Sequence, residues 1–254
     1  MPVTLRTSAT SVPDENEVHI WFAAISDFVS ETRRLDDLLT PEELQKADRF
    51  VRREDRNRSI VARGVLRLVL ASYLKLSPHE VRFERNAHGK PALVRGQGND
   101  SLHFNLSHSG EVVVFAAANS CSVGIDIEQV HSDISALELA AAHFASSELS
   151  TLRSTAEADR TKAFYRCWTR KEAYLKARGE GLTFDLKKFS VTVDSSEPAA
   201  LTWVADDPTA PLRWSIRDVS VPSGYIGSLA IERHSTRSIV RHCGMESGHF
   251  VFRR

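Results

Sequence analysis

The chain has 254 residues, of which 42% are hydrophobic and 26% are charged. This composition is typical of a soluble globular protein that forms one large domain or two small ones. Lysine and arginine together number 33, as do aspartate and glutamate, so no global charge bias favours a nucleic-acid partner.

The cysteines and the apolar runs indicate the cellular compartment and bear on membrane association. The three cysteines form no C-x-x-C pair, which argues against a structural zinc site and fits a reducing compartment. Residues 1–17 are polar, so no secretory signal is visible, and no apolar run is long enough to span a membrane. We expect a cytoplasmic protein without a membrane partner.

The first half is predicted to begin with a strand and two helices. Residues 1–17 are rich in Ser, Thr and Pro and are expected to be flexible. A strand follows at 18–25. Thr40, Pro41 and Glu43 form a helix start with a capping box, and this helix should reach Phe50. A second helix, rich in arginine, is predicted over 55–74.

Short strands and turns follow. Strands are expected at 81–83, 102–106 and 111–118, with a basic turn at 86–91 and a loop at 107–110. The next segment, 123–128, alternates Asp126 and Glu128 with isoleucines, which in a strand sends both carboxylates to one face about 7 Å apart. Such a pair is either a solvated strand face or part of a Mg²⁺ site.

The second half is predicted to be helical and then extended. Helices are expected at 135–145, from Ser147, and at 160–178, the last ended by Gly179. Strands are expected at 189–193, 201–204, 212–216 and 228–231. In the long helix Glu172 and Lys176 lie four residues apart, and by themselves they are typical of a surface ion pair.

The two acidic stretches together are more specific. G-I-D-I-E at 124–128 followed by W-x-R-K-E-A-x-x-K-x-x-G-x-G-L at 168–182 resembles the paired motifs of the 4′-phosphopantetheinyl transferases, in their long, monomeric Sfp-type branch. Three further stretches are similar in the same order: T-P-E with R-F at 40–50, H-G-K-P at 88–91 and F-N-L-S-H-S at 104–109. The resemblance covers roughly residues 18–230.

The resemblance implies a fold and a domain division. We expect the α+β class, with two similar subdomains, each a small antiparallel sheet with packed helices. The predicted boundaries are a flexible terminus at 1–17, an N-terminal subdomain at 18–118, a C-terminal subdomain with the metal site at 119–232, and a tail at 233–254. Coenzyme A is expected between the subdomains.

The resemblance also implies the reaction. Members of this family move the phosphopantetheine arm of coenzyme A to a serine of an apo acyl, peptidyl or aryl carrier protein, and release adenosine 3′,5′-bisphosphate. Mg²⁺, with Mn²⁺ as an alternative, is the implied cofactor. Coenzyme A is the substrate, and the protein is expected to be a monomer.

Ten residues receive roles through the resemblance. Asp126, Glu128 and Glu172 would hold the metal, with Glu172 a ligand, the base that takes the serine proton, or both. Lys176 would support the leaving phosphate. Coenzyme A would be contacted by a set of basic and loop residues: Lys46, Arg63, Lys90, Ser107, His108 and Lys171.

Local alternatives stay open for several of these residues. Lys90 lies in an ordinary turn sequence, Lys46 and Arg63 lie among many solvated charges, and Lys171 is similarly ambiguous. Glu43 stands where the family often has a basic residue. Trp168 is assigned to the core from its helical phase.

Two other functions compete with the transferase. A non-catalytic module that binds coenzyme A or a carrier protein would be expected to have lost part of the acidic set. A metal-dependent hydrolase of nucleotide pyrophosphates would need a further base or acidic cluster, and the sequence suggests none.

Overall fold

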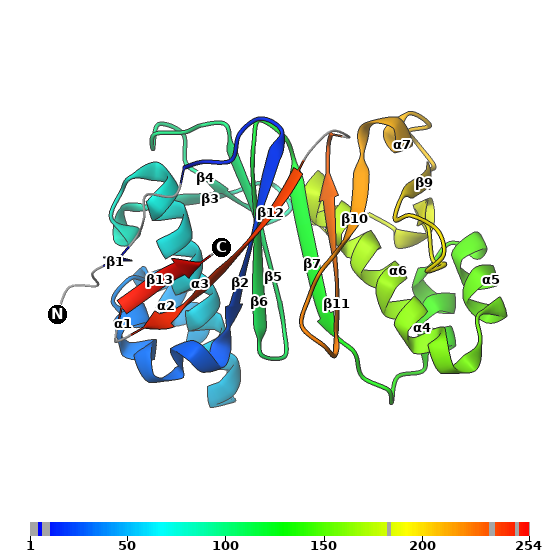
Figure 1. The fold of residues 1–254 in the computed structure, drawn as a ribbon, viewed down its shortest axis with the longest axis horizontal. Coiled ribbons are helices and arrows are strands. Elements are labelled where there is room, and N and C mark those ends of the chain that lie inside the picture. Colours follow the sequence, from blue (N-terminus) through cyan, green and yellow to red (C-terminus); the bar gives the residue numbers. More distant parts are fainter. Residues whose placement is uncertain (1–4, 7–10, 182–183, 234–236, 247–248, 254) are drawn as a thin grey trace. The chain divides into compact units, whose positions relative to one another are not determined.

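The computed structural model describes residues 5–6, 11–181, 184–233, 237–246 and 249–253 (Figure 1). The chain divides into two compact units. The first comprises Met1–Glu84, Pro91–Ser120 and Arg237–Arg254, and the second comprises Arg85–Lys90 and Cys121–Thr236. Each unit contains a 22-residue helix and a β-sheet, so the predicted α+β class with two subdomains is confirmed.

The first unit is built around α3 (Arg53–Leu74) and a six-stranded sheet in the order β1-β13-β12-β2-β6-β5. Its strands are β1 (Leu5–Arg6), β2 (Glu17–Ala24), β5 (Leu102–Ser109), β6 (Val112–Asn119), β12 (Arg237–Glu246) and β13 (His249–Arg253). Its shorter elements are η1 (Ile25–Glu31), α1 (Thr32–Asp36), α2 (Pro41–Ala47), η2 (Pro78–Glu80), β3 (Phe83–Arg85) and β4 (Pro91–Leu93).

This sheet corrects the expectation of a purely antiparallel arrangement. β2 pairs antiparallel with β6 but parallel with β12, and β1 pairs parallel with β13. The two C-terminal strands are therefore part of the first unit, whereas the sequence left residues 233–254 as a separate tail. Of these two strands, β12 covers an edge of β2 that would otherwise expose unpaired backbone groups.

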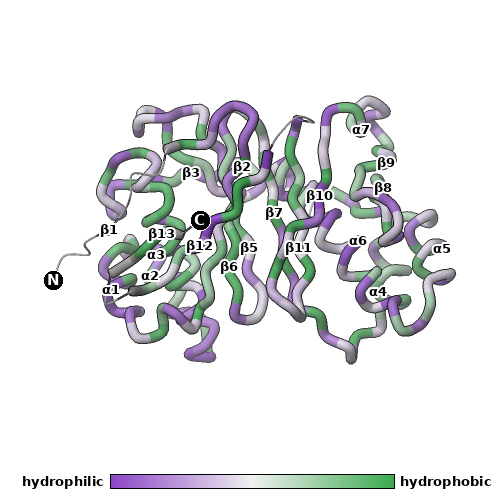
Figure 2. The backbone as a smooth tube through the Cα atoms, viewed as in Figure 1, coloured by the Kyte–Doolittle hydropathy of each residue, from purple (hydrophilic) through white to green (hydrophobic). Residues whose placement is uncertain are grey.

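The core of the first unit joins α3 to β2. Tyr73 of α3 accepts a hydrogen bond from Trp21 Nε1 at 2.7 Å, and its hydroxyl lies 2.7 Å from His19 Nδ1. His19 is 1% exposed, and burial and the nearby Arg241 lower its pKa to about 4. Apolar stretches, green in Figure 2, run along the central strands of the same unit.

The predicted start of α2 is confirmed in detail. Thr40 Oγ1 accepts from Glu43 N at 3.3 Å, and Glu43 Oε2 accepts from Thr40 N at 3.0 Å. Glu43 Oε2 also accepts from the buried Arg67 Nε at 2.8 Å. Glu43 is thus a structural residue that starts α2 and neutralises Arg67 of α3.

The second unit packs α6 (Glu157–Arg178) against a three-stranded antiparallel sheet in the order β10-β11-β7 (Figure 1). The sheet strands are β7 (Val123–Gln129), β10 (Ser215–Val219) and β11 (Tyr225–Ile231). The other elements are α4 (Ala136–His143), α5 (Ser146–Ser154), η4 (Leu186–Lys188), β8 (Phe189–Val191), β9 (Leu201–Val204) and α7 (Ala210–Arg213).

Several local predictions differ from the structure. The helix expected to reach Phe50 ends at Ala47. The strand expected at 212–216 begins as the short helix α7, and β10 starts only at Ser215. The loop expected at 107–110 is mostly strand, because Ser107 and His108 pair with Val114 and Val113 of β6. Leu182 of the resemblance lies outside the described residues. In the described part of the chain, no helix has the length and apolar character of a membrane span.

Candidate active site

The two carboxylates that the sequence singled out lie on β7, as predicted. Ile125 and Ile127 are fully buried and alternate with Asp126 and Glu128 along the strand. Asp126 is 3% exposed and lies opposite Ser228 of β11, whereas Glu128 is half-buried. The strand therefore holds one carboxylate inside the unit and one nearer its surface.

Gly124 brings α6 against this strand. A Cβ at Gly124 would lie 2.1 Å from the carbonyl oxygen of Ala173 and 2.3 Å from the backbone nitrogen of Ala177. No side chain fits there, so the backbones of strand and helix lie in direct contact. Ala173 and Ala177 directly follow Glu172 and Lys176, so this contact brings both predicted site residues to β7.

Lys176 pairs with the strand. Its ammonium donates to Asp126 Oδ1 at 2.6 Å, from a position 50 residues away in the sequence. The Asp126 side chain is almost fully buried and that of Lys176 is partly exposed. The pair is therefore more than the surface contact with Glu172 that helical spacing alone would suggest.

Glu172 has a perturbed environment. Burial, together with the negative charges of Asp126 and Glu128, raises the pKa of this carboxyl to about 7, against the opposing effect of Lys176. Its Oε1 atom is buried and has no hydrogen-bond partner among the described residues. A raised pKa caused by burial and by like charges is a common feature of functional carboxyls.

The donor set fits a hard divalent cation. Asp126, Glu128 and Glu172 offer carboxylate oxygens, which are the ligands that Mg²⁺ prefers. Within the described residues, no three His, Cys, Asp or Glu side chains are already grouped as a metal site. In this structure the positive charge beside Asp126 comes from the ammonium of Lys176 instead.

Lys90 lies at the C-terminal end of α6. Its ammonium donates to the carbonyl oxygens of Ala177 at 3.0 Å and of Val123 at 3.2 Å, and burial lowers its pKa to about 8. The side chain of Asn86 donates to the carbonyl of Gly179 at 2.7 Å. The basic turn thus satisfies backbone groups at the end of the helix. A phosphate contact for Lys90 stays a prediction.

Lys171 is a correction. The sequence assigned it to coenzyme A, but its side chain is 0% exposed and its ammonium donates to both carboxylate oxygens of Glu148, at 2.8 and 2.7 Å. It also donates to the carbonyl of Phe189 at 2.6 Å and lies 4.1 Å from the centre of that ring. A lysine that is enclosed in this way cannot reach a ligand.

Four predicted residues lie in the first unit. Lys46 is exposed on α2, and Arg63 is half-buried on α3. On β5, Ser107 is buried and His108 is exposed. The structure therefore groups within one unit the other predicted residues Asp126, Glu128, Glu172, Lys176 and Lys90. The contacts of Lys46, Arg63, Ser107 and His108 with coenzyme A stay predictions.

The sequence placed Trp168 in the core, and the structure packs its half-buried ring against the core of the second unit, where it also lines a pocket of about 300 Å³. Its ring stacks on Phe164, with the centroids 5.9 Å apart. The pocket is otherwise lined by Glu128 and by apolar and aromatic residues, namely Ile134, Leu139, His143, Phe164 and Tyr165. Helical phase could not reveal this, because the same face of α6 both packs on the core and lines the pocket.

The buried residues that fix α6 were also missed. Thr169 and Arg170 bond to β11 and β10, and no role was predicted for either residue. Their only signal was their position inside the motif, directly before Glu172. Buried hydroxyl and guanidinium groups need partners, which short sequence patterns do not identify.

Comparison with known proteins agrees with the site. Residues 122–230 match the family described as the 4′-phosphopantetheinyl transferase superfamily. Residues 24–120 match the N-terminal family of 4′-phosphopantetheinyl transferases, and this match ends where the first unit gives way to the second.

Individual relatives extend this likeness. The 4′-phosphopantetheinyl transferase HetI of Nostoc sp. is 34% identical over 85% of this chain and 88% of its own. The transferase Sfp of Bacillus subtilis is 35% identical over 63% of this chain and 69% of its own. The human L-aminoadipate-semialdehyde dehydrogenase-phosphopantetheinyl transferase is 32% identical over 59% and 51%. The chain therefore belongs to the 4′-phosphopantetheinyl transferase superfamily, as an enzyme of the Sfp type.

Proposed function

We propose that this enzyme transfers the 4′-phosphopantetheine arm of coenzyme A to a serine of an apo carrier protein, with Mg²⁺ as cofactor and adenosine 3′,5′-bisphosphate as the second product. The supporting observation is the joining of β7 to α6, in which Lys176 lies 2.6 Å from Asp126 and the half-buried Glu172 interacts with the charges of both strand carboxylates.

The reaction consists of three changes, which these residues could assist. The serine oxygen forms a bond to the phosphorus next to the pantetheine, the bond from that phosphorus to the bridging oxygen breaks, and the serine proton must leave. Lys176 would stabilise the negative charge that develops on the departing phosphate, as cationic groups do in phosphoryl transfer generally.

Glu172 is suited to take the serine proton. With a pKa of about 7, this carboxyl exchanges protons near neutral pH, where a general base works best. As a ligand it would act with Asp126 and Glu128 to hold Mg²⁺, which when bound would neutralise charge on the pyrophosphate. The two roles of Glu172 stay alternatives.

The direct test combines the protein, coenzyme A, Mg²⁺ and several apo carrier domains, followed by mass spectrometry of each carrier. We expect a phosphopantetheine adduct on at least one carrier, and none with Glu172→Gln or after chelation of the metal. No adduct on any acyl, peptidyl or aryl carrier would contradict the proposal. Release of phosphopantetheine without a carrier would instead indicate hydrolysis.

The metal can be tested separately. Mn²⁺ should bind with measurable affinity when coenzyme A is present, and much more weakly alone, because the phosphates would supply part of its coordination. Titration calorimetry with and without coenzyme A measures this difference. Equal affinity in both cases would argue against a shared site.

We further propose a monomer that works in the cytoplasm. All three cysteines, Cys121, Cys167 and Cys243, are free and buried, as expected in a reducing compartment. Light scattering during gel filtration would measure the mass in solution, and a dimer mass would contradict the monomer. Coenzyme A and a carrier protein are the proposed partners, without nucleic acid or membrane.

A further inference from the structure

Three consecutive buried side chains fix α6 immediately before Glu172. Thr169, Arg170 and Lys171 are 0%, 1% and 0% exposed. Each bonds in a different direction. Lys171 reaches Glu148 of α5, Arg170 forms a two-bond pair with Asp218 of β10, and Thr169 reaches Ser228 of β11.

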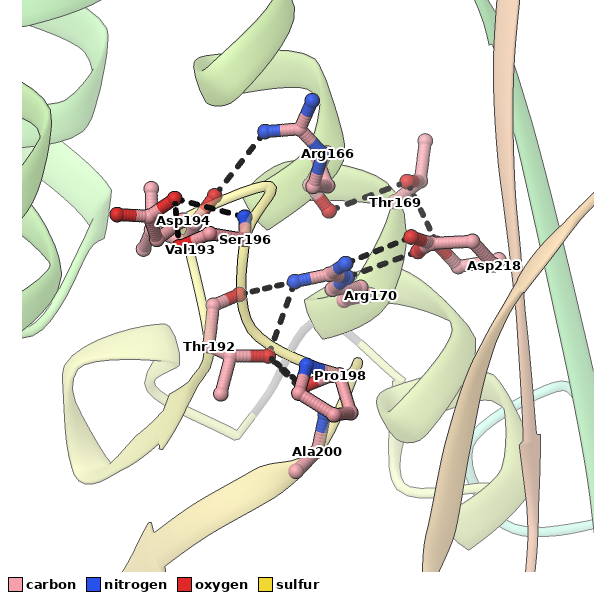
Figure 3. A network of polar contacts seen from close by, with 11 residues as sticks. Arg166, Thr169, Arg170, Thr192, Val193, Asp194, Ser196, Pro198, Ala200 and Asp218 are labelled. Carbon is pink, nitrogen blue, oxygen red and sulfur yellow. Dashed lines mark hydrogen bonds and ion pairs between the residues drawn. The ribbon is translucent and has the colours of Figure 1, made fainter. Parts of the chain in front are cut away.

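The arginine anchor holds the side of α6 that faces the loop after β8. Figure 3 shows Arg170 between Asp218 and Thr192. Its guanidinium also donates to Thr192 Oγ1 at 2.9 Å and to the Thr192 carbonyl at 2.6 Å. This anchor and the lysine anchor stabilise the helix in its unit, but neither bonds to a strand residue beside the acidic cluster.

The threonine anchor has a different location. Thr169 Oγ1 lies 2.9 Å from Ser228 Oγ, and both residues are fully buried. Ser228 is the register partner of Asp126 on β7. Thr169 lies three residues before Glu172, so the two share a helix face. The hydroxyl pair therefore links α6 close to Glu172 with the β11 residue that lies opposite Asp126.

The Thr169 hydroxyl has a second contact on its own helix. Thr169 Oγ1 lies 3.3 Å from the carbonyl oxygen of Arg166, to which it can donate, and either hydroxyl of the Thr169–Ser228 pair can donate to the other. Loss of either hydroxyl would leave the other buried without this hydrogen bond.

We propose that Thr169 and Ser228 are positioning residues, whose hydrogen bond sets the separation of Glu172 from Asp126 and thereby the affinity of the acidic cluster for its cation. This proposal rests on the proposed function for the identity of the cation. Along the same face of α6, the contact at Gly124 and the ion pair of Lys176 with Asp126 follow the hydroxyl pair. The pair thus joins α6 to β11, and the next two contacts join α6 to the neighbouring β7.

The test compares Thr169→Val with Thr169→Ser, which restores the hydroxyl. Mn²⁺ binding in the presence of coenzyme A is followed by electron paramagnetic resonance, next to the transfer rate and thermal unfolding. We expect Thr169→Val to weaken Mn²⁺ binding about five- to twentyfold and to lower kcat about tenfold, with the KM for the carrier unchanged. Thr169→Ser should return both values to within about twofold of the original protein.

A matched control removes a hydroxyl from the arginine anchor. Thr192→Val removes one hydrogen-bond acceptor of Arg170. The Thr192 hydroxyl does not bond to the residue opposite Asp126, so Mn²⁺ binding should stay unchanged. If Thr169→Val does not fold, Ser228→Ala provides the same measurement with a smaller change in volume. It should weaken Mn²⁺ binding in the same direction.

The outcomes separate the two proposals. If the original protein transfers phosphopantetheine and Thr169→Val lowers only its melting temperature, the positioning role is overturned and the transferase stands. If Thr169→Val and Thr192→Val weaken Mn²⁺ binding equally, the hydroxyl pair has no special role. If the original protein transfers nothing yet loses Mn²⁺ affinity in Thr169→Val, the proposed function fails and the positioning role is supported.

Discussion

Replacement of Gly124 by alanine tests whether the site depends on direct contact between strand and helix. The added Cβ would lie 2.1 Å from the Ala173 carbonyl oxygen and 2.3 Å from the Ala177 nitrogen. Both are backbone atoms, so no side chain can rotate to relieve the clash. The helix and the strand must move apart.

The size of the effect follows from these distances. To reach an ordinary separation of roughly 3.5 Å, the 2.1 Å contact must open by more than 1 Å. The flexible Lys176 side chain can follow part of this movement, but Glu172 and Lys176 would both be displaced from their positions beside Asp126. Overpacking of this kind costs about 3 kcal/mol, at the upper end of the usual range. In a chain of this size that lowers the melting temperature by roughly 6–12 °C.

The assay joins thermal unfolding to the carrier-loading reaction. We expect Gly124→Ala to melt at a lower temperature and to lose transfer even at temperatures where it is folded. Gly244→Ala is the control, because its Cβ would meet only Asp27 Oδ2, at an ordinary 3.6 Å. If Gly124→Ala melted within about 2 °C of the original protein and kept its transfer rate, the argued contact would be refuted.

Four further outcomes are expected. Asp126→Asn should abolish transfer with little change in melting temperature, and unchanged transfer would refute the metal assignment. Lys171→Met should cost about 3–5 kcal/mol in urea unfolding by leaving Glu148 buried without a cation, while the KM for coenzyme A stays unchanged in the folded variant. The pKa of His19 is lower in the folded state, about 4 against 6.5 unfolded. The contribution of His19 to the free energy of unfolding is therefore full above pH 6.5 and falls by about 2–3 kcal/mol as the pH drops toward 4. Urea titrations should show this fall, and His19→Gln should flatten it. Lys90→Ala should raise the KM for coenzyme A more than it lowers kcat if Lys90 meets phosphate, whereas a lower melting temperature alone would leave it as the partner of the end of α6.

The elements that carry the site were predictable because their signals are local. The helix expected over 160–178 is observed at Glu157–Arg178, and Gly179 ends it with a φ of 75°. The alternation around Asp126 identified β7 from its own residues. In both cases the information lies within one helix or strand, where periodicity and capping act.

Partners distant in the sequence were not predictable. β12 pairs parallel with β2, so that Arg237 lies opposite Glu17 on a strand from the other end of the chain. Nothing in the sequence near either strand identifies such a partner. Ser107 and His108 have turn-like neighbours, yet their pairing with β6 makes them strand residues. Tertiary pairing overrides local preference at such positions.

The charges of the motif show why residue type alone was insufficient. Arg170, Lys171 and Glu172 are adjacent in the sequence, and of the two cations only Lys171 was predicted to contact coenzyme A. The structure neutralises Arg170 with Asp218, whose side chain is exposed, and Lys171 with Glu148 in a fully buried pair. The sequence offers no rule by which these two distant carboxylates could be chosen from the 33 acidic residues of the chain.

That neutralisation determines the charge left at the site. If all four groups were ionised, Asp126, Glu128 and Glu172 would carry three negative charges against the single positive charge of Lys176, an excess of two. Burial is the main cause of the raised pKa of Glu172, and the negative charges of both strand carboxylates raise it further. A divalent cation would balance the two excess negative charges and return Glu172 to its ionised form. Without a cation, a proton on Glu172 removes one of these charges. Occupation by Mg²⁺ should therefore release a proton near neutral pH, and this links the proposed metal to the carboxyl that would take the proton of the serine.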